Sequence, residues 1–374
     1  MKFVDANGDS YKPSRWLTFN DVLLRPQRSR FNSRNDNSIS MKTRVCDDFY
    51  IDIPLISANM DTVTGEDMAV MMSIFGGLGI LHRFYKSKEE YIHAIRNTKN
   101  RSTQWKGYTD PVLAFSVGCG EKWIDFVKEV VDKIGLKRFI ICIDVAHGHM
   151  NQSIETVAMF YKLKQELKNN NITMGIIAGN IATSEAAEDL IKAGADSLKI
   201  GIGNGGICST RLVTGHGVPQ LSAIMDIKQH IKTFYDNSIT IISDGGIKHS
   251  GDIVKAISAG ADTVMMGSLL AGTSCSAGDL ISLPDGSKRK IYRGQSSRSF
   301  LNDVGKKDVA AEGVCIEIAY KGETEDILKE IIGGIRSGMT YSGAGSLEEM
   351  REAAEFMEIS NNAWIESTPH ALIV

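Results

Sequence analysis

A glycine-rich loop delivers one cysteine to a position where it could do chemistry. Residues 201–220 read GIGNGGICSTRLVTGHGVPQ, and Cys208 is followed by Ser209, Thr210 and Arg211. Glycine lets a backbone bend sharply and approach a ligand closely. A thiolate in such a loop attacks electron-poor carbon far better than a hydroxyl does, which makes Cys208 a candidate nucleophile. The alternative is a buried, unreactive thiol, the common state of a cysteine in a folded protein.

The elements that must position this loop alternate along the chain. Eight short apolar runs have the length of buried strands: Ile53–Ala58, Leu78–His82, Val112–Val117, Phe139–Asp144, Ile172–Ala178, Ser197–Gly201, Ile239–Ser243 and Thr263–Gly267. Helical patterns separate them, at Glu66–Ile74, Glu121–Ile134, Glu155–Lys168, Ser184–Ala193 and Gly251–Ala259, and a last helix is expected at Leu347–Phe356. Eight strand-then-helix units predict an α/β fold, a (β/α)8 TIM barrel forming one domain over 1–374. An open doubly wound sheet is the alternative, but it rarely uses eight regular units.

Polar and glycine-rich residues gather just after the expected strands. Asp144 follows the fourth strand, the cysteine loop follows the sixth, residues 244–246 (DGG) follow the seventh, and residues 267–268 (GS) follow the eighth. Barrel active sites lie at this end of the strands, and phosphate is usually held by the loops after strands seven and eight. We therefore expect the last two segments to bind a phosphate.

A long stretch after the eighth strand does not fit a minimal barrel. Residues 273–346 separate that strand from the last expected helix and include Tyr292, Gly294 and Glu312. A long insertion at the catalytic end of a barrel is typical of a flap or lid. A peripheral hairpin used for contacts between subunits is the alternative.

Composition excludes several classes of protein. The chain has 374 residues, is 43% hydrophobic and carries a net charge of −3, so no basic surplus indicates nucleic-acid binding. Its six cysteines form no CxxC pairs, which argues against a disulfide scaffold and a zinc site and for a reducing compartment. No apolar run reaches the ~18 residues of a membrane span. We expect a cytoplasmic protein with no membrane contact.

Motifs along nearly the whole chain resemble the IMP dehydrogenase/GMP reductase family. The matching segments are 18–24 (TFNDVLL), 59–63 (NMDTV), 76–79 (GGLG), 143–148 (IDVAHG), 178–180 (AGN), the cysteine loop, 244–246, 267–268 and 333–337 (GGIRS). The resemblance implies a TIM barrel, usually a homotetramer, that acts on C2 of a purine 5′-monophosphate, GMP or IMP, through a covalent thioimidate. This chemistry is reasonable because a thiolate can add to the electron-poor C2, and hydride can then leave or arrive at the same carbon.

The resemblance assigns roles to individual residues. Cys208 matches the nucleophile, and Thr210 and Glu312 would form the proton-donating pair. The nucleotide would contact Ser57, Gly206, Asp244, Gly245, Gly246, Gly267, Ser268, Tyr292, Gly294 and Gln295. The cofactor, NADPH or alternatively NAD, would lie at Asp144, Gly201, Gly203 and Arg83. The carbonyls of Gly201, Gly203 and Cys208 match those that hold a potassium ion in many dehydrogenases of the family.

One position departs from the family pattern. The loop usually reads Gly-Pro-Gly-Ser before the cysteine pair, whereas this chain reads GNGG at 203–206. Gly206 cannot supply the hydroxyl that normally contacts the phosphate, although its amide still can. We expect weaker or rearranged phosphate binding.

The choice between the two activities depends on the flap. Only the seventeen residues 295–311 separate Gly294 from Glu312, and they lack the Arg-Tyr pair with which dehydrogenases activate water. The segment Phe84–Pro111 has no room for the regulatory modules that many dehydrogenases carry. These features favour a GMP reductase, whereas segments such as 292–294 (YRG) resemble a dehydrogenase. The alternatives are an IMP dehydrogenase without regulatory modules and an inactive purine-nucleotide-binding homologue.

Overall fold

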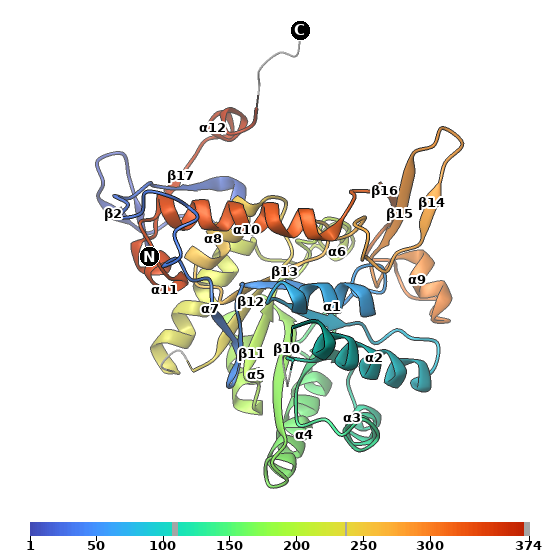
Figure 1. Ribbon diagram of the computed structural model, residues 1–374. Coiled ribbons are helices and arrows are strands. Elements are labelled where there is room, and N and C mark those ends of the chain that lie inside the picture. Colours follow the sequence, from blue (N-terminus) through green and yellow to red (C-terminus); the bar gives the residue numbers. More distant parts are fainter. Residues whose placement is uncertain (107–110, 236–237, 370–374) are drawn as a thin grey trace.

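Eight parallel strands close into a barrel at the centre of the protein (Figure 1). The computed structural model describes residues 1–106, 111–235 and 238–369, so a few positions of the single domain expected over 1–374 lie outside the described residues. In sequence order the barrel strands are β6 (Leu55–Ser57), β7 (Leu78–Leu81), β8 (Ala114–Val117), β9 (Arg138–Asp144), β10 (Thr173–Ile181), β11 (Ser197–Ile200), β12 (Thr240–Asp244) and β13 (Thr263–Met266). β13 pairs with β6 and closes the ring. The predicted (β/α)8 TIM barrel is confirmed.

The inside of the barrel is filled and is closed at one end by a hairpin. Strands β4 (Thr43–Cys46) and β5 (Phe49–Ile51) pair with each other, and their buried side chains join a core cluster with inward residues of the barrel strands. The hairpin is held at the beginnings of the strands: Thr43 Oγ1 donates to the Asp262 carbonyl at 2.9 Å, and Arg138 pairs with Asp48 at 2.9 Å. Ligands must therefore reach the barrel from the opposite end, where the strands finish.

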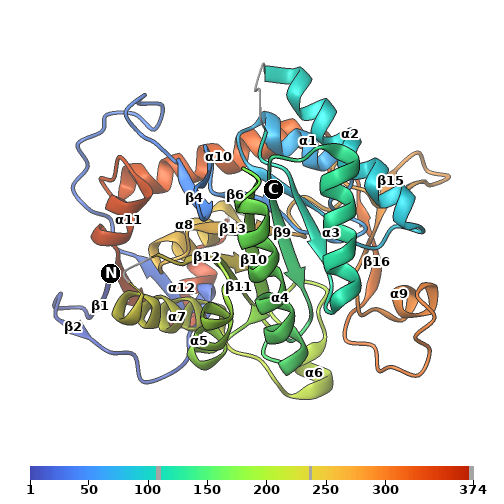
Figure 2. The same cartoon turned by 90° about the horizontal axis from the view of Figure 1, so that it is seen from below.

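An outer ring of helices covers the barrel (Figure 2). These are α1 (Glu66–Ile74), α2 (Lys88–Lys106), α3 (Glu121–Ile134), α4 (Asn151–Lys168), α5 (Ser184–Ala193), α7 (Gln220–Phe234), α8 (Ser250–Ser258) and α10 (Thr324–Tyr341). In α3, Phe126, Val127, Val130 and Val131 are buried, which is the one-sided apolar stripe of a helix packed on a sheet. Among the described residues, no helix has the length and apolarity that crossing a bilayer requires.

The chain leaves the barrel after β13 to build a small sheet. Strands β14 (Leu280–Ser282), β15 (Lys288–Arg293) and β16 (Cys315–Ala319) are antiparallel, and α9 (Arg298–Asp303) lies in the connection between the last two. This sheet projects to one side of the barrel (Figure 1). It occupies part of the range expected as an insertion; α10 occupies the rest and packs against α8.

The two ends of the chain meet in a second sheet. Its strands are β1 (Lys2–Val4), β2 (Ser10–Tyr11), β3 (Val22–Leu24) and β17 (Glu355–Glu358), and the helical segments beside it are η1 (Phe19–Asp21), α11 (Leu347–Ala353) and α12 (Asn361–Glu366). The prediction of a helix over Leu347–Phe356 was wrong at its C-terminal end, because α11 stops at Ala353. Phe356 is instead fully buried in β17, which pairs with β1 and β3, so pairing with the distant N-terminus outweighs local helical preference.

Candidate active site

The cysteine loop and the side sheet bring three predicted catalytic residues into one chain of contacts. Cys208 Sγ lies 3.2 Å from Thr210 Oγ1, and Thr210 Oγ1 donates to Glu312 Oε2 at 2.9 Å. Thr210 begins the short helix α6 (Thr210–Thr214) and lies two residues after Cys208 in the sequence. We call Cys208, Thr210 and Glu312 the relay. Its order allows a proton to pass between a carboxyl group and an atom held beside the sulfur.

Backbone contacts fix the relay across two distant segments. The amide of Ser209 donates to the Glu312 carbonyl at 2.9 Å, and the amide of Val314 donates to the Ile207 carbonyl at 3.0 Å. Gly313 forms a bridge with Cys208 between these two bonds. The carboxyl group is therefore held by a strand-like docking of the insertion onto the loop, not by its side chain alone.

Cys208 is exposed, unlike the two cysteines of the core cluster inside the barrel. Cys46 and Cys142 are fully buried, and burial raises the pKa of both thiols. The buried, unreactive state that is common for cysteine therefore does not apply to Cys208. Its thiol is accessible at the open end of the barrel, as a nucleophile requires.

Glycines shape the surface beside the thiol. A Cβ on Gly201 would lie 2.0 Å from the Asp244 carbonyl oxygen, so only glycine fits where β11 passes β12. Gly245 has φ 86°, which side chains rarely adopt. Gly206 is exposed, and a Cβ there would lie 3.8 Å from the Ser268 Cβ. The loops after β11 and β13 thus meet at the place expected to hold the phosphate, and there is room for the side chain that Gly206 lacks.

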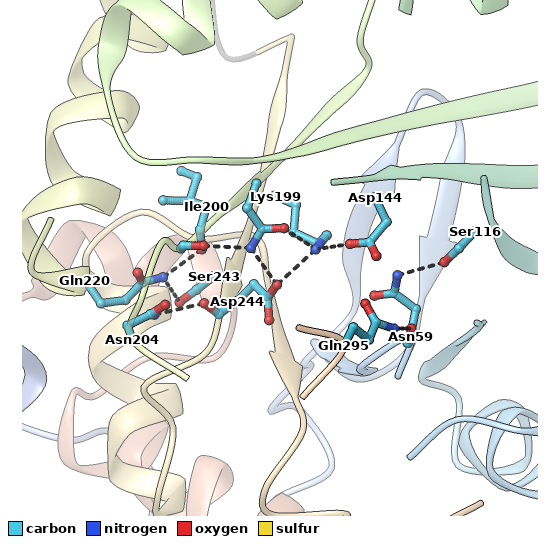
Figure 3. A network of polar contacts seen from close by, with 12 residues as sticks. Asn59, Ser116, Asp144, Lys199, Ile200, Asn204, Gln220, Ser243, Asp244 and Gln295 are labelled. Atoms are coloured by element: carbon cyan, nitrogen blue, oxygen red, sulfur yellow. Dashed lines mark hydrogen bonds and ion pairs between the residues drawn. The ribbon is translucent and has the colours of Figure 1, made fainter. Parts of the chain in front are cut away.

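A buried group of charges connects the ends of four strands (Figure 3). Lys199 Nζ lies 2.8 Å from Asp144 Oδ1 and 3.0 Å from Asp244 Oδ2, and it also contacts Asn180 Oδ1. Asn180 Nδ2 in turn donates to Asp244 Oδ2 at 2.8 Å and to the Gly201 carbonyl at 2.7 Å. We call Asp144, Asn180, Lys199 and Asp244 the charge network. It joins the carboxylate expected at the cofactor to the carboxylate expected at the ribose.

Each charge in the network stabilises the charged form of its neighbours. Burial by itself raises the pKa of Asp144, but the Lys199 ammonium outweighs it and holds that pKa below its ordinary value. Burial by itself lowers the pKa of Lys199, but Asp144 and Asp244 raise it above its ordinary value. Asp144 and Lys199 are therefore both charged at neutral pH.

Sequence reasoning missed Lys199 and Asn180. Lys199 is only 2% exposed although it interrupts the apolar run SLKI of β11. A lysine inside a predicted buried strand is a usable signal, because a buried ammonium needs opposite charges nearby. The sequence gives no indication of which carboxylates those are.

Other predicted contact residues line the same end of the barrel. Gln295 Nε2 donates to the Asn59 carbonyl at 2.7 Å, which ties the start of the flap to the loop after β6. Tyr292 is 4% exposed, and burial with the nearby Asp244 carboxylate raises its pKa, so its hydroxyl stays a neutral donor. Its oxygen lies 2.9 Å from where a Cβ on Gly267 would stand. Gly294, which lies between Tyr292 and Gln295 in the sequence, is beside the cysteine loop, because a Cβ there would stand 3.6 Å from the Ile207 carbonyl oxygen.

Two predicted residues are engaged within the protein itself. Ser57 is fully buried, and its hydroxyl accepts a hydrogen bond from Thr64 at 2.9 Å. Arg83 Nη2 donates to the Asp144 carbonyl at 3.3 Å, so its guanidinium lies beside the residue expected at the nicotinamide. Arg83 can still reach a ligand with its other donors, whereas Ser57 contributes mainly to the wall.

The potassium site expected from the resemblance stays a prediction. The Gly201 carbonyl already accepts the Asn180 amide, so a cation there would share this oxygen. Within the described residues, no group of three or more His, Cys, Asp or Glu side chains could hold a metal ion. We assign no chemical step to a cation.

Comparison with known proteins agrees with this geometry. The IMP dehydrogenase / GMP reductase domain matches residues 16–370. The chain is 36% identical to the inosine-5′-monophosphate dehydrogenase of Borreliella burgdorferi, covering 95% of this chain and 96% of that protein. It is also 36% identical to GMP reductase 2 of Mus musculus, covering 92% and 94%. It is 31% identical to the inosine-5′-monophosphate dehydrogenase of Nitrosopumilus maritimus, covering 96% and 98%. The chain therefore belongs to the IMP dehydrogenase/GMP reductase family of oxidoreductases.

Proposed function

We propose that this protein is a GMP reductase, which converts GMP, NADPH and two protons into IMP, NADP⁺ and an ammonium ion. The observation that carries the proposal is the relay, in which Thr210 Oγ1 contacts both Cys208 Sγ at 3.2 Å and Glu312 Oε2 at 2.9 Å. Expulsion of an amino group requires its protonation, because amide ion is too basic to leave. A carboxyl group acting through a hydroxyl beside the nucleophile supplies that proton.

The first step uses Cys208. Its sulfur forms a bond to C2 of the purine, and the electron pair of the C2–N3 double bond moves to N3, which takes up a proton. Glu312 then protonates the 2-amino group through Thr210, the carbon–nitrogen bond breaks, and ammonia leaves a thioimidate on Cys208. A bound reduced nicotinamide supplies the hydride that replaces the amino group. Cys208 then leaves as a thiolate and recovers its proton.

Binding of the nucleotide is assigned to the surfaces that flank the relay. The backbone amides at Gly206, Gly245 and Gly246 and the hydroxyl of Ser268 would hold the phosphate. Asp244 would bind the ribose hydroxyls, and the charge network keeps that carboxylate in place. Asp144 and Arg83 would position the nicotinamide over the purine ring.

The arginines of the flap support a reductase over a dehydrogenase. A dehydrogenase must activate water to hydrolyse the thioimidate, and the family does this with an Arg-Tyr pair. Here Arg293 is tied to Asp61 at 2.6 Å and Asp303 at 2.5 Å, and Arg298 donates to the Lys307 carbonyl at 2.9 Å. Both side chains are engaged by other groups of the protein, Arg293 by the loop after β6 and by the flap, and Arg298 by the flap.

IMP dehydrogenase is the second candidate, because relatives with that name are as similar to this chain as relatives named GMP reductase. In this case IMP, NAD⁺ and water would give XMP, NADH and a proton. The same nucleophile would act, the hydride on C2 would leave for NAD⁺, and water would then displace Cys208 from the thioimidate.

One assay separates these functions. The purified protein is incubated with GMP and NADPH, with IMP and NAD⁺, and with each nucleotide alone, while the absorbance of reduced nicotinamide is followed. Loss of NADPH only in the presence of GMP, with release of ammonia, is the expected result. Formation of NADH from IMP without any consumption of NADPH by GMP would contradict the proposal, and binding without turnover would indicate an inactive homologue. Cys208→Ser is the control for turnover at this site.

A further inference from the structure

Two side-chain amides hold Asp244 at the end of β12 (Figure 3). Asn180 Nδ2 donates to its carboxylate at 2.8 Å, and this contact belongs to the charge network. Asn204 Nδ2 donates to its backbone carbonyl at 2.9 Å, and this contact lies outside the network. Because Asn204 comes from the cysteine loop, its side chain ties that loop to the segment that follows β12.

That segment is a glycine turn with two free donors, and we call Gly245 and Gly246 the phosphate turn. Their φ angles are 86° and 77°, values that glycine adopts far more readily than other residues. Among the described residues, neither backbone amide donates to a protein acceptor. Two successive glycines are flexible, and a ligand that has to order them on binding loses affinity. The turn therefore needs a contact that holds it in place before the nucleotide arrives.

Asn204 packs directly against the phosphate turn. A Cβ on Gly245 would lie 3.1 Å from Asn204 Nδ2 and 3.1 Å from its Oδ1. A Cβ on Gly246 would lie 3.6 Å from Asn204 Nδ2 and 3.6 Å from Cε2 of the buried Phe19 ring. Phe19 and Asn204 thus fill the space beside the turn, and Asn204 adds a hydrogen bond to the residue before it.

This hydrogen bond departs from the family pattern. The pattern usually has proline at this position, and a proline side chain has no donor. Two residues later, Gly206 stands where the pattern has a serine, so the loop lacks the hydroxyl that normally contacts the phosphate. The same loop that has lost a direct contact therefore holds the phosphate turn through Asn204.

We propose that Asn204 is a positioning residue for the substrate's 5′-phosphate. By binding the Asp244 carbonyl, it fixes the phosphate turn so that the amides of Gly245 and Gly246 face the phosphate. Asn204 acts through the backbone and makes no contact with the reacting atoms. The proposal rests on the phosphate assignment within the proposed function, and it identifies what orders that part of the site.

The test compares ligands with and without the phosphate in the full-length enzyme. Asn204→Leu keeps the branched shape of the side chain and removes the donor. Calorimetry measures the binding of GMP, and displacement of GMP measures the binding of ribose 5-phosphate and of guanosine. We expect the affinity for GMP and for ribose 5-phosphate to fall about fivefold, and that for guanosine to change less than about twofold. Equal losses for all three ligands, or unchanged affinity for ribose 5-phosphate, would overturn the proposal.

Two further variants keep this result interpretable. Asn204→Ala is used with the leucine variant because it introduces no new bulk, and we expect it to show the same selective loss. Asn170→Leu is the matched control, since Asn170 Nδ2 donates to the Glu166 carbonyl at 3.3 Å at the end of α4, far from the open end of the barrel. It should leave all three affinities unchanged. Wild-type affinity for ribose 5-phosphate in Asn204→Ala would also overturn the proposal.

A titration with IMP separates this proposal from the proposed reaction. IMP carries the same 5′-phosphate as GMP, so Asn204→Leu should weaken its binding by the same factor whichever reaction the enzyme performs. Failure of GMP reduction therefore leaves this readout intact. Equal affinity of the wild type and the variant for both nucleotides would overturn the role of Asn204 even if GMP reduction is observed.

Discussion

The relay and the charge network lie at the same end of the barrel but are built in opposite ways. Asp144 and Lys199 of the network are buried, and all four members lie in the last two residues of barrel strands, with Lys199 2% exposed. The relay joins an exposed thiol in a loop to a carboxylate on the insertion, which lies more than a hundred residues away in sequence. One cluster is thus part of the barrel, and the other exists only where the insertion docks on it.

Because the two clusters are built differently, the proton-transfer groups can change independently of the groups in the barrel. The strand ends hold the charges that would orient the nucleotide and cofactor, and such rigid positions preserve binding geometry. The relay depends on a few backbone bonds between the cysteine loop and residues 312–314. A change in the insertion can therefore alter the proton transfers without disturbing the barrel.

The largest effect is expected at the nucleophile. Cys208→Ser should reduce turnover in either direction more than about a hundredfold, because a hydroxyl in place of the thiol cannot form the covalent intermediate efficiently. Nucleotide affinity should remain close to that of the wild type, since the binding groups are other residues and the substitution leaves the backbone of the loop in place. Steady-state kinetics and calorimetric titration with GMP measure the two quantities. Activity above about one hundredth of the wild type would exclude covalent catalysis at this residue.

The charge network should respond to a change at Lys199 in both stability and binding. Lys199→Met leaves the buried Asp144 and the partly buried Asp244 without their cation, which should lower the free energy of unfolding by about 3–5 kcal/mol and weaken nucleotide binding. Lys199→Arg keeps the charge and should recover part of both. Urea unfolding and GMP titration test this. Equal loss in Met and Arg variants would mean that the shape of lysine, and not its charge, is what matters.

The pH dependence of the same variant sharpens this prediction. In the wild type, the pKa of Asp144 is lowered, so this carboxylate stays charged until the pH falls below about 4, the ordinary pKa of an aspartate. The pKa of Lys199 is raised, so its ammonium group stays charged up to at least about pH 10. In Lys199→Met, burial alone should raise the pKa of Asp144. The difference in the free energy of unfolding between the wild type and Lys199→Met should then shrink as the pH falls from 7 to about 5, because Asp144 takes up a proton in the folded variant. A deficit that stays constant over this range would contradict the assignment.

The relay should show a step-specific effect at Glu312. Glu312→Gln keeps the side-chain shape and removes the acid, so GMP reduction should slow by about a hundredfold or more, in the usual range for general acid–base catalysis. Hydride exchange between IMP and NADP⁺ should be less affected, because no amine leaves in that half-reaction. Isotope exchange and ammonia release measure the two steps. GMP reduction at the wild-type rate would remove the relay from the mechanism.

The smallest effects are expected at the phosphate site. Ser268→Ala should raise KM for GMP about fivefold, the usual value of one hydrogen bond, with kcat unchanged. Gly206→Ser should lower KM by a similar factor, because the Cβ has room beside Ser268 and its hydroxyl restores a phosphate contact. Initial-rate kinetics on both variants provide the comparison. Loss of kcat in Ser268→Ala with unchanged KM would show that the phosphate binds elsewhere.

Local pattern predicted the barrel better than the parts around it. Ile176, Ile241 and Val264 lie in runs that are apolar on both faces, as strands covered by helices must be, and each run formed a barrel strand close to its expected position. The stretch around Phe356 had an equally plausible helical pattern but became a strand. Its partners in β1 and β3 lie at the other end of the chain, and a local pattern carries no information on such pairing.

The candidate site divides in the same way. The sequence by itself determined the strands, the positive-φ glycines of the loops that follow them, and the place of Cys208 at the open end of a barrel, because these depend on short-range periodicity and backbone sterics. Only the tertiary structure decided that Lys199 lies between Asp144 and Asp244, and that Lys86 and Lys122 line one groove with Trp123. These arrangements bring together side chains from different strands and helices. The physical reason is that burial and closure of the barrel set which charges meet, and each strand alone is compatible with many partners.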